Sequence, residues 1–214
     1  PRTPHPAPPW ETAMERTAHI QPLPVDATPE LRALADIAQA SGGYVATSMR
    51  IMAHKPAILL AFRDLIQGVM RAPGEVPQDL KWLVAHTVSS AAGCRYCQAH
   101  TAADGAKAGL AVQKVQALAD YPSSPLFTAA ERAAVALAWA AGEVPNAVTR
   151  AHFDALRVHF TEPGIVELVS VISVFGWLNR WNDTFASDLE DSPLAFARQN
   201  LSAARGWDAG KHGA

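Results

Sequence analysis

Apolar residues recur every three or four positions through most of the chain after residue 28, which is the period of an α-helix. The clearest stripe lies between Pro56 and Pro73 and consists of Ile58, Leu59, Phe62, Leu65, Ile66 and Val69. No segment of convincing length alternates apolar and polar residues as a half-buried β-strand does. The pattern predicts an all-α protein of about ten helices.

Proline, glycine and capping residues indicate where these helices begin and end. Thr128, followed three residues later by Glu131, is a capping box at the start of one helix. The expected helices cover residues 28–41, a short stretch through Met49 and Met52, and then 56–72, 77–92, 94–108, 112–118, 133–141, a stretch from Pro145 through Phe160, 162–185 and 193–204. Together they predict one helical domain over residues 28–214.

Residues 1–27 differ from the rest of the chain because proline, which favours extended backbone, is frequent there. We expect them to form a proline-rich arm. The arm lacks the unbroken apolar stretch of a secretory signal. The most apolar segment, residues 164–177, is interrupted by Glu167 and is too short to span a membrane. We therefore expect a cytoplasmic protein without a membrane partner.

Charge gives no sign of a nucleic-acid partner. The 214 residues carry 18 basic and 20 acidic side chains, a formal net charge of −2. No run of five or more like charges occurs along the chain. A nucleic-acid-binding protein would show a basic patch or stripe.

Cys94 and Cys97 are the only two cysteines in the chain. A disulfide between residues three apart closes a very short loop, so it would stabilise the fold little. A zinc site needs four ligands, and the chain offers no second cysteine pair. Thiol redox chemistry is the favoured interpretation over metal binding or incidental thiols, and it requires no cofactor.

Local sequence around this pair supplies further groups for redox chemistry. Gly93 is suited to end one helix with positive φ, which places Cys94 near the N-terminus of the next helix, where the helix dipole favours a thiolate. Cys97 lies on the same face, one turn away, and His100 continues that face. His86, on the preceding helix, is a second candidate for moving the proton.

Glu167 stands in an apolar run and needs a partner if it is buried. We expect a structural network with the polar residues that follow it on the same helix, namely Asn179, Arg180 and Asn182.

The segment LKWLVAHTVSSAAGCRYCQAHTA, residues 80–102, resembles the core motif of the AhpD-like, carboxymuconolactone decarboxylase superfamily. The flanking segments MAHKPAILLAF and FTEPGIVELVSVISVFGWLNRWND resemble its peroxidase-related branch. The resemblance implies an all-helical fold, a homo-oligomer, and reduction of small hydroperoxides by the cysteine pair. It also implies that Cys97 is attacked by peroxide and that Cys94 resolves it, whereas the helix dipole favours Cys94 as the more acidic thiol.

Two positions depart from the family pattern. Trp82 stands where the peroxidase members carry a glutamate, and His86 lies one turn further along the same face, where it could replace that carboxylate. Thr101 stands where the family has a histidine, and His100 comes one residue earlier.

The favoured function is a peroxidase or disulfide reductase that acts on a small hydroperoxide or disulfide and is regenerated by a thiol reductant. Two alternatives stay open: a lactone decarboxylase-like enzyme that works without thiols, and an oligomeric redox sensor that is oxidised once without turnover.

Overall fold

Residues 18–40, 43–202 and 206–213 of this computed structural model are described, and within these ranges the chain forms helices and no strand. The α-helices are α1 (Pro29–Ala40), α2 (Thr47–Met52), α3 (Pro56–Ile66), α4 (Gln78–Ala91), α5 (Arg95–Lys107), α6 (Val112–Gln116), α7 (Ala129–Gly142), α8 (Arg150–Arg157), α9 (Glu162–Phe185) and α10 (Asp191–Asn200). A π-helical segment, η1 (Gln67–Arg71), extends α3, and two 3₁₀ turns are η2 (Leu118–Asp120) and η3 (Gly210–His212). The predicted all-α class is confirmed.

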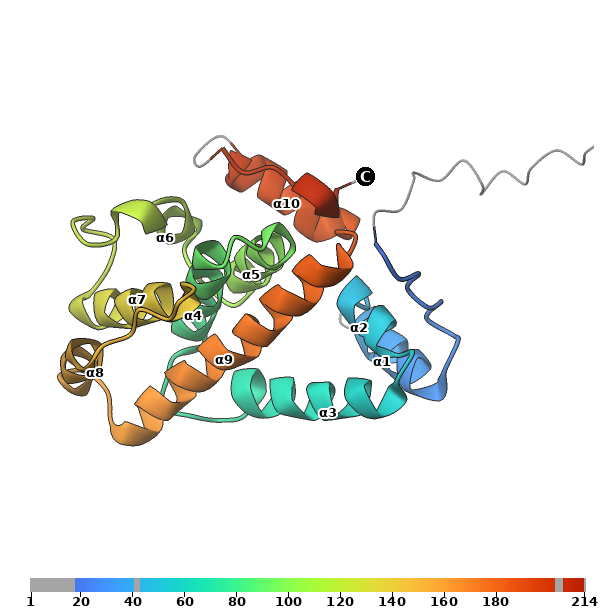
Figure 1. The fold of residues 1–214 in the computed structure, drawn as a ribbon, viewed down its shortest axis with the longest axis horizontal. Coiled ribbons are helices and arrows are strands. Elements are labelled where there is room, and N and C mark those ends of the chain that lie inside the picture. The colour runs from blue at the N-terminus through green and yellow to red at the C-terminus, as the bar shows by residue number, and fades with distance from the viewer. Residues whose placement is uncertain (1–17, 41–42, 203–205, 214) are drawn as a thin grey trace, which may run out of the picture.

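Helix α4 occupies the centre of the fold and contacts α5, α7 and α9. Its residues from Leu83 to Ser89 are all buried, so the helix is enclosed on every side. The 24-residue α9 crosses the whole molecule (orange in Figure 1), with α4, α5 and α7 on one side of it and α3 on the other. The C-terminal segment, which contains α10, packs against α5.

Small residues allow α4 and α7 to approach closely. A Cβ atom at Gly142, the last residue of α7, would lie 2.6 Å from the Cβ atom of Ala91 and 3.1 Å from the carbonyl oxygen of Val88. Real Cβ atoms do not tolerate the first of these distances. The glycine is therefore required where α7 ends against α4.

Most helix boundaries follow the sequence signals. The capping box of Thr128 and Glu131 is formed, and Gly93 has φ of +75° between α4 and α5. The predicted helix start at Pro145 is wrong, because α8 begins at Arg150. Thr149 caps this helix, and its N–H donates a hydrogen bond to His152. Residues 1–17 of the predicted arm lie outside the described residues.

Glu167 has a different partner from the one that its sequence neighbours suggested. The Lys81 Nζ lies 3.0 Å from a Glu167 carboxylate oxygen, and the Glu75 N–H donates to the other oxygen at 2.7 Å. Although partial burial opposes ionisation, these donors lower the pKa of Glu167. The network joins α4 to α9 and is structural, as expected, but Asn179, Arg180 and Asn182 are the wrong partners.

No helix in the described ranges combines the length and the apolarity that a membrane span requires.

Candidate thiol site

Cys94 is the N-cap residue of α5, as the glycine before it predicted, and Gly93 has the expected positive φ. Its Sγ accepts a hydrogen bond from the backbone N–H of Cys97 at 3.4 Å. This N–H is one of those that have no partner inside the helix, so the sulfur takes the place of a capping oxygen. The positive end of the helix and this donor both favour negative charge on the Cys94 sulfur.

Both thiols are free and buried. Burial, followed by a hydrogen bond with the Cys94 thiol, raises the pKa of the Cys97 thiol. The side-chain amide of Asn182, on α9, donates to the Cys97 sulfur at 3.5 Å and opposes this rise. Cys97 is therefore held as a neutral thiol in the resting site.

The C-terminal segment brings a histidine and a lysine to the Cys94 side of the site. Ligand atoms of Cys94, Asp183 and His212 all lie within 4.8 Å of one another. His212 Nε2 lies 3.1 Å from one Asp183 carboxylate oxygen, and Lys211 Nζ lies 3.3 Å from the other. His212 Nδ1 lies 2.9 Å from the carbonyl oxygen of Ser187.

Cys94, Asp183 and His212 are also the residues in the described ranges that are grouped closely enough to hold a metal ion. A structural zinc ion takes four protein ligands and a catalytic one takes three, but both ring nitrogens of His212 already face the oxygen atoms of Ser187 and Asp183. The sequence predicted no metal.

A second polar cluster surrounds His100 on the outer side of α5. His100 Nε2 lies 2.6 Å from one carboxylate oxygen of Glu190, and His100 Nδ1 lies 3.1 Å from the hydroxyl of Tyr44. Tyr96 stacks on the imidazole with ring centroids 4.3 Å apart and donates its hydroxyl hydrogen to Glu190 at 2.9 Å. The hydrogen bonds of both His100 ring nitrogens are thus directed to this cluster.

In the His100 cluster, the pKa values of Glu190 and Tyr96 are shifted in opposite directions. Burial alone would raise the pKa of this carboxyl group, but the charge and hydrogen bond of His100 and the N–H of Thr47 lower it to about 2. Burial and the adjacent Glu190 carboxylate raise the pKa of the Tyr96 phenol well above its usual value. Glu190 is therefore ionised and Tyr96 neutral across the physiological pH range.

His86 lies on α4 and is connected to the cysteine helix through Thr101. The Thr101 hydroxyl donates to the carbonyl oxygen of Cys97 at 2.7 Å, so it accepts at 3.0 Å from the Nδ1 of His86. Thr101 occupies the position of the family histidine. Trp82, at the family glutamate position, instead approaches Gly105, where an added Cβ would lie 3.2 Å from its own Cβ.

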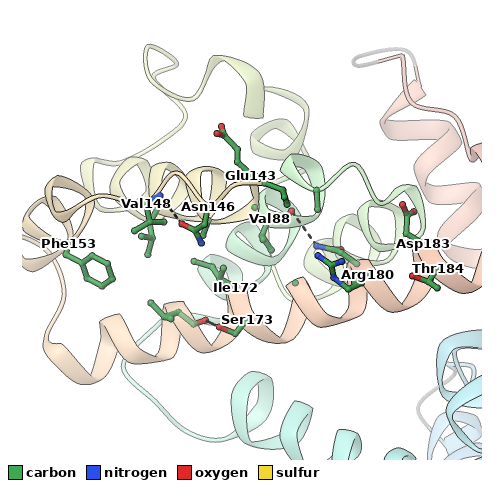
Figure 2. Close-up of a pocket in the computed structure, with 18 residues that line it drawn as sticks. Val88, Glu143, Asn146, Val148, Phe153, Ile172, Ser173, Arg180, Asp183 and Thr184 are labelled. Carbon is green, nitrogen blue, oxygen red and sulfur yellow. Dashed lines mark hydrogen bonds between the residues drawn. The ribbon is translucent and has the colours of Figure 1, made fainter.

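A cavity of about 720 Å³ opens beside the site, between α9, the end of α7 and α8. Figure 2 shows Arg180, Asp183 and Thr184 on α9 at one end and Phe153 of α8 at the other. One end is polar and charged, and the other is lined by apolar side chains. Asp183 belongs both to this cavity and to the cluster at Cys94.

The sequence indicates the two cysteines, His86 and His100 as site residues, but not the groups that contact them. The sequence pattern shows that α9 ends in polar residues, and Asp183 is one of them. No sequence motif links Asp183 to Cys94. Glu190 and His212 follow α9 in segments without a motif. Only the return of the C-terminal segment across α5 brings them to the site.

A sequence model of the carboxymuconolactone decarboxylase family matches residues 56–141, from α3 to α7. The uncharacterized protein YnjA of Escherichia coli K12 is 26% identical over 140 residues, which are 65% of this chain and 77% of YnjA. An uncharacterized peroxidase-related protein from Ralstonia eutropha JMP134 superposes with a TM-score of 0.72 at 21% identity, covering 86% of this chain and 96% of that one.

The debrominase Bmp8 superposes with a TM-score of 0.75 at 30% identity, covering 83% of this chain and 95% of Bmp8. A cysteine-to-alanine variant of Bmp8, solved in complex with 2,3,4-tribromopyrrole, gives a TM-score of 0.76 at 29% identity, covering 85% of this chain and 98% of that one.

Proposed function

Because this chain belongs to the AhpD-like, carboxymuconolactone decarboxylase superfamily, we propose that it is a thiol-dependent oxidoreductase in which Cys94 and Cys97 cycle between dithiol and disulfide. The observation that carries the proposal is the contact between the two residues: Cys94 caps α5, and its sulfur accepts the Cys97 N–H. Thiols one helical turn apart at a helix N-terminus suit reversible oxidation.

The first candidate reaction is reduction of a small organic hydroperoxide. The hydroperoxide and the two thiols give an alcohol, water and the intramolecular disulfide. A thiol reductant then restores the dithiol by exchange. The cavity beside Asp183 supports this candidate, because its apolar end suits an organic group and its polar end suits the peroxide.

A second candidate is reductive debromination of a brominated aromatic compound, which the likeness to Bmp8 favours. In this reaction the aryl bromide and two thiols give the arene with hydrogen in place of bromine, hydrogen bromide and the disulfide. The two electrons again come from the cysteine pair. The two candidates therefore share the same protein chemistry and differ in the bond that is broken.

His86 and His100 are proposed to support proton transfer. His86 reaches the Cys97 backbone through Thr101, whereas both ring nitrogens of His100 bond to Tyr44 and Glu190, so His100 acts through this cluster and not directly on a thiol. The buried cysteine pair argues against a thiol-independent decarboxylase, since that chemistry makes no use of two thiols. A cytoplasmic location and a homo-oligomeric state belong to the same proposal.

The test begins with the fully reduced protein and one equivalent of cumene hydroperoxide, with free thiols counted by mass spectrometry. We expect rapid loss of both thiols and a disulfide between Cys94 and Cys97. The matched controls are Cys94→Ser and Cys97→Ser, neither of which can form this bond. Persistence of both thiols under excess peroxide and excess brominated pyrrole would refute the proposal.

Turnover then separates the candidates. With dithiothreitol as reductant, a peroxidase consumes peroxide repeatedly, a debrominase releases bromide from 2,3,4-tribromopyrrole, and a sensor stops after one oxidation. The Cys94→Ser, Cys97→Ser double variant gives the background rate for each reaction. Bromide release without peroxide consumption would assign the second candidate.

A further inference from the structure

We infer that His212, held by Asp183 and Lys211, is the proton-transfer group of Cys94, and that Cys94 is therefore the attacking thiol. The inference rests on the proposed redox function and adds residues and a direction to it. It reverses the order that the family resemblance implies, in which Cys97 is attacked first.

The hydrogen bonds of His212 determine its protonation. Its Nδ1 faces the carbonyl oxygen of Ser187 at 2.9 Å, and a carbonyl oxygen only accepts hydrogen bonds. Its Nε2 faces a carboxylate oxygen of Asp183 at 3.1 Å, which accepts as well when ionised. Both ring nitrogens satisfy these acceptors only when each carries a proton, so the geometry selects an imidazolium.

The charges next to Cys94 sum to a positive value. An imidazolium at His212 and the ammonium of Lys211 outweigh the single carboxylate of Asp183, to which both are bonded. A thiolate at Cys94 neutralises the excess. Besides Cys97, Asp183, Lys211 and His212, the helices that carry or flank Cys94 hold further charged or titratable side chains: Asp79, Lys81 and His86 on α4, Arg95, Tyr96, His100, Asp104 and Lys107 on α5, and Asp191 and Arg198 on α10.

Cys97 is buried like Cys94, but it lies outside the group that Cys94 forms with Asp183 and His212. Its burial and the neighbouring sulfur raise its pKa, which keeps it a thiol while Cys94 is the thiolate. An attacking thiolate paired with a neutral resolving thiol is the division of roles that a two-thiol reduction requires.

With a hydroperoxide as substrate, the resting pair is the Cys94 thiolate and the His212 imidazolium. The Cys94 sulfur bonds to the terminal peroxide oxygen while the O–O bond breaks, leaving a sulfenic acid on Cys94 and an alkoxide. The proton passes from His212 through Asp183, which lines the cavity, to the alkoxide. The Cys97 sulfur then bonds to the Cys94 sulfur, and the departing hydroxide takes the Cys97 proton and leaves as water.

The test titrates the Cys94 thiolate in the Cys97→Ser background, where Cys94 is the only cysteine of the chain. The thiolate is followed by its ultraviolet absorbance and by the rate of alkylation with iodoacetamide. We expect His212→Gln to move the titration midpoint up by about one pH unit, which is about tenfold less thiolate near neutral pH. Adding Asp183→Asn to His212→Gln should reverse part of this shift, because it removes the uncompensated carboxylate.

Trp207→Phe is the matched control, because it changes the same C-terminal segment without altering a titratable group, and its midpoint should equal that of the parent. Lys211→Met provides a second test, since this half-exposed side chain can be replaced without opening the core, and it should raise the midpoint by a smaller amount. An unchanged midpoint in folded His212→Gln overturns the inference. If His212→Gln does not fold, an unchanged midpoint in Lys211→Met does so.

This titration uses neither peroxide nor brominated substrate. A shifted midpoint in a protein that reduces neither substrate would leave the inference standing and refute the proposed function. An unchanged midpoint in a protein that reduces peroxide would do the reverse.

Discussion

At the scale of single residues, Glu190 is the strongest example of a charge whose state depends on its neighbours. Its carboxylate receives hydrogen bonds from Tyr96, from the backbone of Thr47 and from His100. These contacts join α2 and α5 to the segment before α10. The carboxylate therefore contributes to folding as well as to the orientation of His100.

We expect Glu190→Gln to lower the free energy of unfolding near neutral pH by up to about 3 kcal/mol, since a pKa shift from the usual value to about 2 corresponds to that order of energy. Because the folded-state pKa is lowered, the stabilisation is present above the unfolded pKa and is lost as pH falls toward about 2. The difference between variant and parent should therefore shrink on acidification. Urea unfolding at several pH values measures it.

Glu162→Gln is the control for this experiment. Glu162 pairs with Arg157 at 2.9 Å, but both side chains are largely exposed, so the loss of this pair should change stability little at any pH. An equal, pH-independent effect of the two substitutions would contradict the role given to Glu190.

At the scale of helices, the position of the cysteine helix depends on how tightly α4 is enclosed. α4 packs against α5 on one side and α7 on another. Gly142 permits the second contact, because any side chain there would meet Ala91. Close packing of α7 thus supports the helix from which His86 reaches α5.

We expect Gly142→Ala to destabilise the protein by about 2 kcal/mol, because the new methyl group overlaps the Cβ of Ala91 where the end of α7 packs against α4. Gly176→Ala is the matched control: Gly176 also lies in a helix, and nothing approaches within 4 Å of its added Cβ. That substitution should leave stability unchanged or raise it slightly, because alanine favours helix. Thermal unfolding of both variants decides, and equal melting temperatures would contradict the packing argument.

At the scale of the whole molecule, an apolar hollow of about 620 Å³ lies on the outer face formed by α3, η1, α8 and α9. Leu65, Val166 and Trp177 line it and remain substantially exposed, with exposed fractions of 52%, 63% and 40%. Trp177 also stacks on Phe62 and Trp181. Exposed apolar patches of this kind are typical of protein interfaces, so this hollow is where we expect the subunits of a homo-oligomer to meet.

We expect the protein to form an oligomer in solution through this hollow and Val166→Glu to shift it to a smaller species, because the new charge would be buried at the interface. Light scattering after size-exclusion chromatography measures the mass. Val158→Glu is the control, since Val158 is 75% exposed but does not line the hollow. A monomeric parent protein, or an unchanged mass in Val166→Glu, would contradict this prediction.

Much of the fold was predictable because its signals are local. The apolar period, the capping box at Thr128 and the glycine at 93 indicate helices and their ends from residues a few positions apart. The residues next to Cys94 in the sequence also place it at a helix start, one turn before Cys97. The likeness to AhpD-like structures agrees with the predicted fold. The start of α8 was mispredicted because Pro145 suits both a helix start and a loop.

By itself, the sequence determined the all-α class, most helix boundaries and the cysteine pair, because each depends on backbone propensity and on short-range spacing. The tertiary structure alone decided which charged groups lie beside Cys94 and His100. Asp183 and His212 are 29 residues apart, and Glu190 is 90 residues from His100. Such pairs form only when helix packing and the returning C-terminal segment bring residues together that are far apart in the sequence. The chemistry of the site depends on that packing.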